Sequence, residues 1–222
     1  MSTLQLYGYW RSSASFRVRI ALELKALRYE YRPVHLLNDG GGQYAAGYRQ
    51  LNPEARVPTL VCAEGALTQS MAIMEWLEEQ YPTPALLPRA PLARARVRAI
   101  AQLLVADIQP LQNVSVTRYL RERLKLDEGA VREWLRSWIG RGLEALEAQL
   151  AHATADGAAS GDFCVGDTPT LADVCLVAQC YSSRRFGVDT ERYARITRIE
   201  RRCNALAAFV RAAPERQPDA NT

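Results

Sequence analysis

Apolar side chains in the first eighty residues recur with two periods, and each period predicts one kind of element. Alternation of apolar and polar residues is typical of a strand, and an apolar residue at every third or fourth position is typical of a helix with one buried face. A polar, glycine-rich stretch over 38–43 opens a short helical or irregular segment. The order is βαβαββα, which predicts a small mixed α/β domain. The strands are expected over 4–9, 28–36, 58–62 and 66–70, and the longer helices over 15–27 and 70–81.

The pattern of apolar and polar residues changes after Tyr81. Residues 82–91 contain four prolines, which break any helix and mark a linker. Beyond them, long helical patterns run over 92–126, 130–153, 170–184 and 195–212. Thr170 and Asp173 stand three residues apart before an apolar run, the spacing of a capping box. We therefore expect an α+β protein with a mixed domain over 1–83, a linker over 84–90 and an all-helical domain over 91–222.

Composition bounds the class of protein. With 222 residues, 48% of them hydrophobic, the chain is long enough for a sizeable core. The net charge of +4 is spread along the chain, and the arginine runs near Arg94 and Arg201 have helical spacing, so we interpret them as solvated helix faces and expect no nucleic-acid partner. No apolar run reaches 18 residues and no signal-peptide pattern opens the sequence, so we expect a cytoplasmic protein without a membrane span.

The cysteines and histidines form neither a disulfide pattern nor a ligand pattern. The five cysteines are odd in number, never two residues apart and set among apolar neighbours, which favours reduced core thiols. His35 and His152 lie more than a hundred residues apart, with no ligand cluster around either. We therefore expect no metal site.

Serines stand at the entrance of the first predicted helix. A serine at this place caps the helix, because its oxygen accepts an orphan N–H of the first turn, but a helix N-terminus also holds anions and stabilises thiolates. Domains of thioredoxin type carry Cys-x-x-Cys here for redox chemistry, whereas residues 12–15 read SSAS. Any thiol chemistry therefore needs a thiol that a ligand brings. The buried face of this helix is expected to consist of Phe16, Ile20, Leu24 and Leu27.

Two further short stretches admit a structural and a functional interpretation. Pro58 is either an ordinary first residue of a strand or one end of a cis bond that leaves the N–H and C=O of Val57 free to pair with an extended peptide. Gln69 and Ser70 stand before the last helix of the domain, where Ser70 is a natural cap. The same amide and hydroxyl beside a helix N-terminus are also suited to holding a carboxylate.

The chain resembles the zeta class of the cytosolic glutathione transferases over almost its whole length, from Leu4 to about Asp219. Seven motifs carry the resemblance, in this order: RSSASFRVRIAL, LNPEARVPTL, QSMAIMEWLEEQYPTPALLP, IQPLQN, GDTPTLADVCLV, RRFGVD and RQPD. The first contains the hallmark Ser-Ser-Cys-x-x-Arg of the class, with Ala14 in place of the cysteine. The resemblance implies a thioredoxin-like N-terminal domain, an all-helical glutathione transferase C-terminal domain, a homodimer and glutathione as cofactor.

The resemblance also implies roles for individual residues. Ser12 falls on the catalytic serine of the family and Ser13 on its neighbour at the thiol. Arg11 and Arg185 fall on substrate-binding cations, of which Arg185 also counts as catalytic; without the resemblance, Arg185 would be read equally as a surface residue near a helix C-terminus. Alkylation or mixed-disulfide chemistry at Ala14 is not expected, since alanine has no thiol. The implied glutathione contacts are Ser12, Ser13, Gln43, Val57, Pro58, Gln69, Ser70 and Gln112.

The implied activity is glutathione-dependent cis–trans isomerisation of a small acidic substrate, maleylacetoacetate to fumarylacetoacetate, in aromatic amino acid degradation. A thiolate adds to the double bond, the resulting single bond rotates and the thiolate leaves. Maleylpyruvate is the alternative substrate, although residues 113–116 lack the arginine pair of some maleylpyruvate enzymes. A general glutathione transferase or α-haloacid dehalogenase, and a non-catalytic module on the same fold, are the competing functions.

Overall fold

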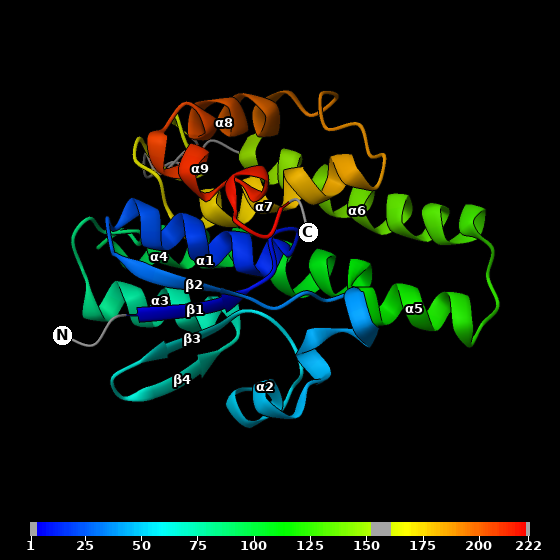
Figure 1. The fold of residues 1–222 in the computed structure, drawn as a ribbon. Coiled ribbons are helices and arrows are strands. Elements are labelled where there is room, and N and C mark those ends of the chain that lie inside the picture. Colours follow the sequence, from blue (N-terminus) through cyan, green and yellow to red (C-terminus); the bar gives the residue numbers. More distant parts are fainter. Residues whose placement is uncertain (1–3, 152–160, 221–222) are drawn as a thin grey trace. The chain divides into compact units, whose positions relative to one another are not determined.

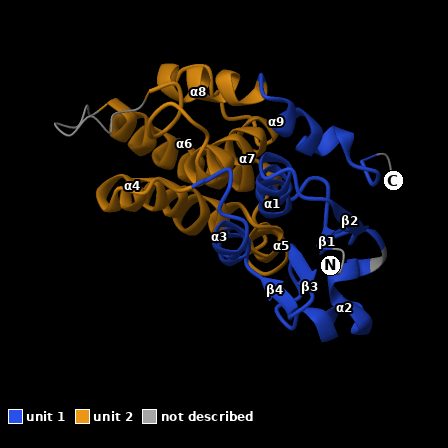
Figure 2. Ribbon diagram, turned by 90° about the vertical axis from the view of Figure 1, so that its left-hand side faces the viewer, with its two compact units in different colours: residues 1–86, 205–222 blue, residues 87–204 orange. Residues whose placement is uncertain are grey.

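The computed structural model describes residues 4–151 and 161–220, and for Asp39 the main chain alone. Contacts group the described chain into two compact units, coloured in Figure 2. Unit 1 runs to Leu86 and resumes at Ala205, and unit 2 is Leu87–Asn204. The segment that begins at Ala205, expected in the helical domain, packs with unit 1 in the structure. The first division between the units, after Leu86, falls within the proline-rich stretch over 82–91.

Unit 1 has the predicted βαβαββα order. The described residues of this unit contain a four-stranded sheet with the order β2-β1-β3-β4, in which β1 and β2 are parallel and the other neighbours are antiparallel (Figure 1). The thioredoxin-like arrangement is therefore confirmed. The elements are β1 (Leu4–Gly8), α1 (Ser13–Leu24), β2 (Tyr29–Pro33), η1 (Asn38–Gly40), η2 (Gly42–Tyr44), α2 (Ala46–Leu51), β3 (Thr59–Cys62), β4 (Gly65–Thr68) and α3 (Ser70–Gln80), and after unit 2 they are α9 (Ala207–Ala212) and η5 (Pro214–Arg216).

Helix α1 is buried on more than the one face expected. It packs against both α3 and α9, so that even Arg17 and Arg19 are 1% and 0% exposed. Phe16 and Ile20 of the predicted face are buried, whereas the side chains of Leu24 and Leu27 are only half-buried. The difference arises because α9, which is remote in sequence, covers a second face of the helix.

Unit 2 is helical, as predicted. Two of the expected long helices are interrupted, the one over 92–126 and the one over 195–212, which is divided between α8 (Ala194–Asn204) and α9. The pattern over 92–126 is broken because Pro110 has no N–H to donate and Asn113 caps a new helix by accepting from the Ser115 N–H at 3.0 Å. No helix in the described ranges is both long and apolar enough to span a membrane. The elements are α4 (Pro91–Gln102), the π-helical turn η3 (Leu103–Ile108), η4 (Gln109–Gln112), α5 (Val114–Glu122), α6 (Glu128–Ala151), α7 (Leu171–Arg185) and α8 (Ala194–Asn204).

The predicted capping box opens α7. Asp173 accepts from the main-chain N–H and the hydroxyl of Thr170, each at 2.8 Å. The other carboxylate oxygen of Asp173 accepts from the N–H of Cys164 at 2.8 Å, which ties the preceding loop to the helix. Burial raises the pKa of the Asp173 carboxyl, although these hydrogen bonds oppose the shift. The motif is thus structural, as its spacing indicates.

Candidate active site

The strand register gathers the candidate residues of unit 1 at one end of the sheet. Gly8, the last residue of β1, lies opposite Pro33, the last residue of β2. Thr59, the first residue of β3, lies opposite both Tyr7 and Thr68. The segments that adjoin this end, which we call the site end, carry six predicted residues: Ser12, Ser13, Val57, Pro58, Gln69 and Ser70.

Ser12 is the N-cap of α1, and the capping leaves its hydroxyl proton available. Its Oγ accepts the N–H of Ser15 at 3.2 Å, and its carbonyl accepts the N–H of Phe16 at 2.8 Å. A hydroxyl has one proton to donate besides its lone pairs, so capping does not prevent donation to an anion. In the described chain, neither Ser13 nor Ala14 has a partner for its main-chain N–H. The two interpretations of Ser12 are therefore compatible: the hydroxyl can cap the helix and donate to a thiolate at the same time.

The start of α3 forms the second half of this arrangement. Gln69 is exposed, has φ +65° and donates from its Nε2 to Glu54 Oε2 at 2.5 Å. Ser70 is 4% exposed, and its Oγ accepts from Arg17 Nε and Nη2 at 3.2 and 3.0 Å. Because Arg17 donates, the Ser70 hydroxyl proton remains for a ligand acceptor. The arrangement offers an amide, a hydroxyl and a nearby guanidinium, which suits a carboxylate.

Sequence reasoning missed the supporting residues Arg17 and Glu54. Arg17 had a signal, because it is the arginine of the hallmark motif and a charge in the middle of an apolar helical run. Glu54 had none. Its contact with Gln69 joins residues 15 positions apart across the β3–β4 hairpin, and although both strands were predicted, no pattern in the sequence indicates this side-chain contact.

The Val57–Pro58 peptide bond is cis, which confirms that alternative. Pro58 is buried beside the first residue of β3, and Val57 is half-buried. The N–H and C=O of Val57 take part in no hydrogen bond within the described ranges. They are therefore available to an extended ligand.

Gln43 and His35 lie on the segment between β2 and α2. Gln43 is 5% exposed and donates from Nε2 to the carbonyl of Leu36 at 3.4 Å, while its Oε1 is buried with no partner in the described part of the chain. His35, which sequence reasoning did not select, accepts two main-chain N–H groups at Nδ1, and its ring lies 4.8 Å from that of Tyr9. In the neutral imidazole the proton is then on Nε2, a further donor. Groups of three or more potential metal ligands are absent from the described residues.

Gln112 belongs to unit 2, where its amide is engaged with Gln179. Each Nε2 donates to the Oε1 of the other, at 3.0 and 3.1 Å, and both side chains are buried. Gln179 also donates to Ser183 Oγ at 3.2 Å. This reciprocal pair gives Gln112 a structural function in joining η4 to α7.

The two candidate substrate cations share one local geometry. Arg11 and Arg185 are exposed, and each guanidinium stacks over the ring of a chain neighbour, Trp10 at 4.4 Å and Phe186 at 4.7 Å. Stacking restricts the guanidinium without consuming its in-plane N–H donors. The ring of the chain neighbour therefore partly orders the plane of each guanidinium.

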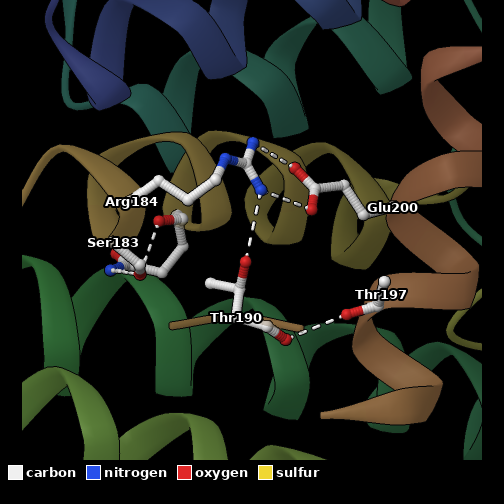
Figure 3. A network of polar contacts seen from close by, with 6 residues as sticks. Ser183, Arg184, Thr190, Thr197 and Glu200 are labelled. Carbon is white, nitrogen blue, oxygen red and sulfur yellow. Dashed lines mark hydrogen bonds and ion pairs between the residues drawn. The ribbon is translucent and has the colours of Figure 1, made fainter. Parts of the chain in front are cut away.

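Arg184, the residue before Arg185, belongs to a polar network near the end of α7. Figure 3 shows the Arg184 guanidinium facing the carboxylate of Glu200, with both hydrogen bonds at 2.7 Å, and reaching Thr190 Oγ1 at 3.4 Å. Thr197 donates to the carbonyl of Thr190 at 2.9 Å, which fixes the loop between α7 and α8. Glu200 is buried, and its hydrogen bonds with Arg184, followed by its charge, raise the pKa of Arg184. Of the two adjacent arginines, Arg184 is committed to the fold.

Comparison with known proteins adds independent information. Residues 11–80 match the family described as Glutathione S-transferase, N-terminal domain. The maleylacetoacetate isomerase of Pseudomonas aeruginosa is 48% identical over 97% of this chain and 98% of its own. A holo structure of maleylpyruvate isomerase, titled a bacterial glutathione S-transferase in the zeta class, is 47% identical with a TM-score of 0.92, over 97% of this chain and 99% of its own.

A third relative has been solved with ligands. The maleylacetoacetate isomerase of Anaeromyxobacter dehalogenans is 51% identical with a TM-score of 0.84 over 98% of both chains, and that structure has bound GSH in the active site. Another structure of the same enzyme has dicarboxyethyl glutathione and citrate in the active site.

Proposed function

Because the chain belongs to the zeta class of the glutathione transferases, we propose that it is a glutathione-dependent isomerase that converts maleylacetoacetate to fumarylacetoacetate. The observation that carries the proposal is the pair of helix starts at the site end. One start offers Ser12 in place of a redox cysteine, and the other offers Gln69 and Ser70. A protein without a thiol of its own at this helix start, where an anion can bind, is suited to a thiol that arrives with a ligand.

The residues of unit 1 fit an extended thiol peptide such as glutathione. Gln69 and Ser70 would hold the γ-glutamyl carboxylate, and the unpaired N–H and C=O of Val57 would pair with the peptide backbone. The buried Oε1 of Gln43, which has no partner in the described residues, would accept a ligand N–H. Leaving such an acceptor unpaired costs about 1–3 kcal/mol, so a ligand that satisfies it gains affinity.

Bound glutathione supplies a thiolate, which adds to an alkene conjugated with a ketone and leaves again after rotation about the carbon–carbon bond. Ser12 would donate its hydroxyl proton to the sulfur, and the first turn of α1, with the N–H groups of Ser13 and Ala14, would favour the ionised thiol. Arg11 and Arg185 would bind the substrate carboxylates and neutralise developing negative charge. The dicarboxyethyl glutathione in the Anaeromyxobacter enzyme supports this chemistry, because addition of the thiol to a cis-butenedioate gives that group.

Comparative turnover of two substrates tests the proposal. The purified protein is given maleylacetoacetate or maleylpyruvate, with and without glutathione, and formation of the trans product is followed. We expect glutathione-dependent turnover, faster with maleylacetoacetate. Preference for maleylpyruvate would favour the second candidate, which rests on the 47% identical maleylpyruvate isomerase. Binding of glutathione in a thermal-shift titration without turnover of either substrate would instead point to a general transferase, dehalogenase or non-catalytic module.

The biological setting completes the proposal. We infer a homodimer in the cytoplasm, acting in aromatic amino acid degradation on a small acidic substrate. Size-exclusion chromatography with light scattering measures the subunit number directly. A monomeric enzyme with full activity would contradict the dimer and leave the isomerase proposal intact.

Variants at the start of α3 test the placement of glutathione. Gln69→Ala and Ser70→Ala are each expected to weaken glutathione binding by about 1–3 kcal/mol, the value of a charge-assisted hydrogen bond. Ser70→Ala should also lower the free energy of unfolding, because Ser70 Oγ accepts two N–H groups of Arg17 in a buried place. Isothermal titration calorimetry measures the affinity. Gln80→Ala, at the exposed far end of the same helix, is the matched control and should bind normally. Wild-type affinity in both site variants would show that the placement is wrong.

A further inference from the structure

The position of Ser12 depends on the turn that precedes it. The N–H of Ser12 donates to the carbonyl of Tyr9 at 3.0 Å, which closes a turn over residues 9–12. The N–H of Tyr9 donates to Ser15 Oγ at 3.3 Å, and Ser15 is fully buried in the first turn of α1. These contacts fix the two ends of the turn. Its middle, Trp10 and Arg11, must be held by other parts of the chain.

Arg19 holds the carbonyl groups of this turn from inside unit 1. Its side chain is 0% exposed, and its Nη2 donates to the carbonyl of Trp10 at 3.0 Å, with a longer contact of 3.5 Å from Nη1 to the carbonyl of Tyr9. The Nε donates to the carbonyl of Ala212 in α9 at 3.0 Å. One guanidinium therefore joins the turn to the segment that returns to unit 1 after Asn204.

Asp219, near the C-terminal end of the same segment, also contacts the turn over 9–12. Its side chain is 4% exposed, and Oδ2 accepts the N–H of Trp10 at 3.1 Å and the hydroxyl of Tyr31 at 3.4 Å. Both main-chain groups of Trp10 are thus held, the carbonyl by Arg19 and the N–H by Asp219. The segment itself is fastened to α1 a second time, because Arg211 Nε donates to Glu23 at 2.6 Å.

We propose that Asp219 is a positioning residue for the reaction: it holds the turn over 9–12 through the Trp10 N–H and so places the Ser12 hydroxyl against the thiol. The inference rests on the proposed function. All of the residues concerned belong to unit 1, and the contact joins positions 209 residues apart.

A carboxylate suits this place better than a neutral acceptor. Hydrogen bonds to an ionised acceptor are stronger than those to a neutral one, and a buried arginine requires a nearby negative charge. Burial lowers the pKa of Arg19, and Tyr31, Tyr29 and Asp219, in that order, act in the opposite direction. Asp219 therefore both receives the Trp10 N–H and favours the charged form of the guanidinium that holds the Trp10 carbonyl.

Hydrogen exchange of the ligand-free protein tests the contact without any assumption about the reaction. Asp219→Ala is compared with Gln217→Ala, a matched control in the same segment whose amide donates to the carbonyls of Arg211 and Ala213 and does not touch the turn. In Asp219→Ala we expect faster exchange of the amides of residues 10–12, with protection of the second half of α1 retained. In Gln217→Ala exchange in the turn should remain as in the wild type. Unchanged exchange in Asp219→Ala would overturn the proposal.

A second measurement connects the turn to the thiol. The apparent pKa of glutathione bound to each variant is read from the ultraviolet absorbance of its thiolate, and turnover is measured on the same samples. Asp219→Ala should raise that pKa and lower kcat about tenfold, within the range expected when a catalytic group is displaced by less than 1 Å. Gln217→Ala should change neither. Equal effects of the two variants would reduce Asp219 to a general stabilising residue.

Two further comparisons keep the test decisive. If Asp219→Ala does not fold, Asp219→Asn replaces it, since the amide keeps the shape but is a weaker acceptor; wild-type thiol pKa and wild-type exchange in that variant would overturn the proposal. Failure of the proposed function has a different signature. In that case the wild-type protein itself would not bind glutathione or would not lower the pKa of its thiol, whatever the exchange rates of the turn.

Discussion

Replacing Ser12 with glycine should reduce turnover near neutral pH by about tenfold to a hundredfold while leaving the fold nearly as stable as before. Glycine is itself an acceptable N-cap and costs only a few tenths of a kcal/mol, so the loss of the Ser15 contact is small. Removing the hydroxyl proton has a larger effect on the bound thiolate, because a hydrogen bond to a charged acceptor contributes about 1.5–3 kcal/mol. The pKa of the bound thiol should rise, and less of it is ionised.

The direction of the pH effect provides the measurement. In Ser12→Gly the rise of activity with pH should move to higher pH by the same amount as the thiol pKa, so that turnover recovers in alkaline solution. Ser12→Thr, which keeps both the cap and the proton, is the control and should retain an ordinary profile. A glycine variant with unchanged turnover and thiol pKa would leave Ser12 as a helix cap only.

The two adjacent arginines at the end of α7 should respond in opposite ways. Arg185→Ala is expected to lower kcat/KM for the acidic substrate by about tenfold to a hundredfold, the value of one lost charge-assisted contact, without changing the thiol pKa. Arg184→Ala removes both hydrogen bonds to the buried Glu200, so it should lower the free energy of unfolding by about 1–3 kcal/mol. Steady-state kinetics and urea unfolding of the pair measure both effects.

Arg185→Lys separates charge from shape. It keeps the positive charge but loses the planar fork, so it should recover part of the lost kcat/KM. Arg184→Ala should retain turnover per folded molecule near the wild-type value. If Arg184→Ala loses as much activity as Arg185→Ala while remaining folded, then Arg184 acts on the substrate as well and the division between the two residues is wrong.

The elements that could be predicted from the sequence are those set by local chemistry. The capping box at Thr170 and Asp173 and the N-cap at Ser12 follow from properties of a few consecutive residues. Local sequence left two interpretations of Pro58 open, of which the structure has the cis bond. The expected cap at Ser70 is wrong, because Gln69 is the N-cap of α3 and Ser70 is its first helical residue. The order of strands and helices in unit 1 follows in the same way from the period of the apolar positions.

What could not be predicted depends on contacts between distant positions. The spacing of Phe16 and Ile20 indicates one buried face, but the burial of Arg17 and Arg19 follows from a second covering helix that begins at Ala207. The residues that support the site have the same origin. Each can be identified only from the folded structure, which brings it into contact with its partner. The contacts are Glu54 with Gln69, Arg17 with Ser70, Asp219 with Trp10 and Glu200 with Arg184.

The return of the chain to unit 1 after Asn204 has a consequence for biosynthesis. A ribosome completes the sheet and helices α1–α3 first, then must translate all of unit 2 before the segment that carries Ala212 and Asp219 emerges. Domains generally fold as units during synthesis, with the N-terminal one first, but here the first unit lacks one of its pieces until late in translation. In the nascent chain, the face of α1 that packs against α9 therefore stays uncovered until the residues after Asn204 have been translated. We expect chaperones to bind this face of α1 during synthesis of the chain.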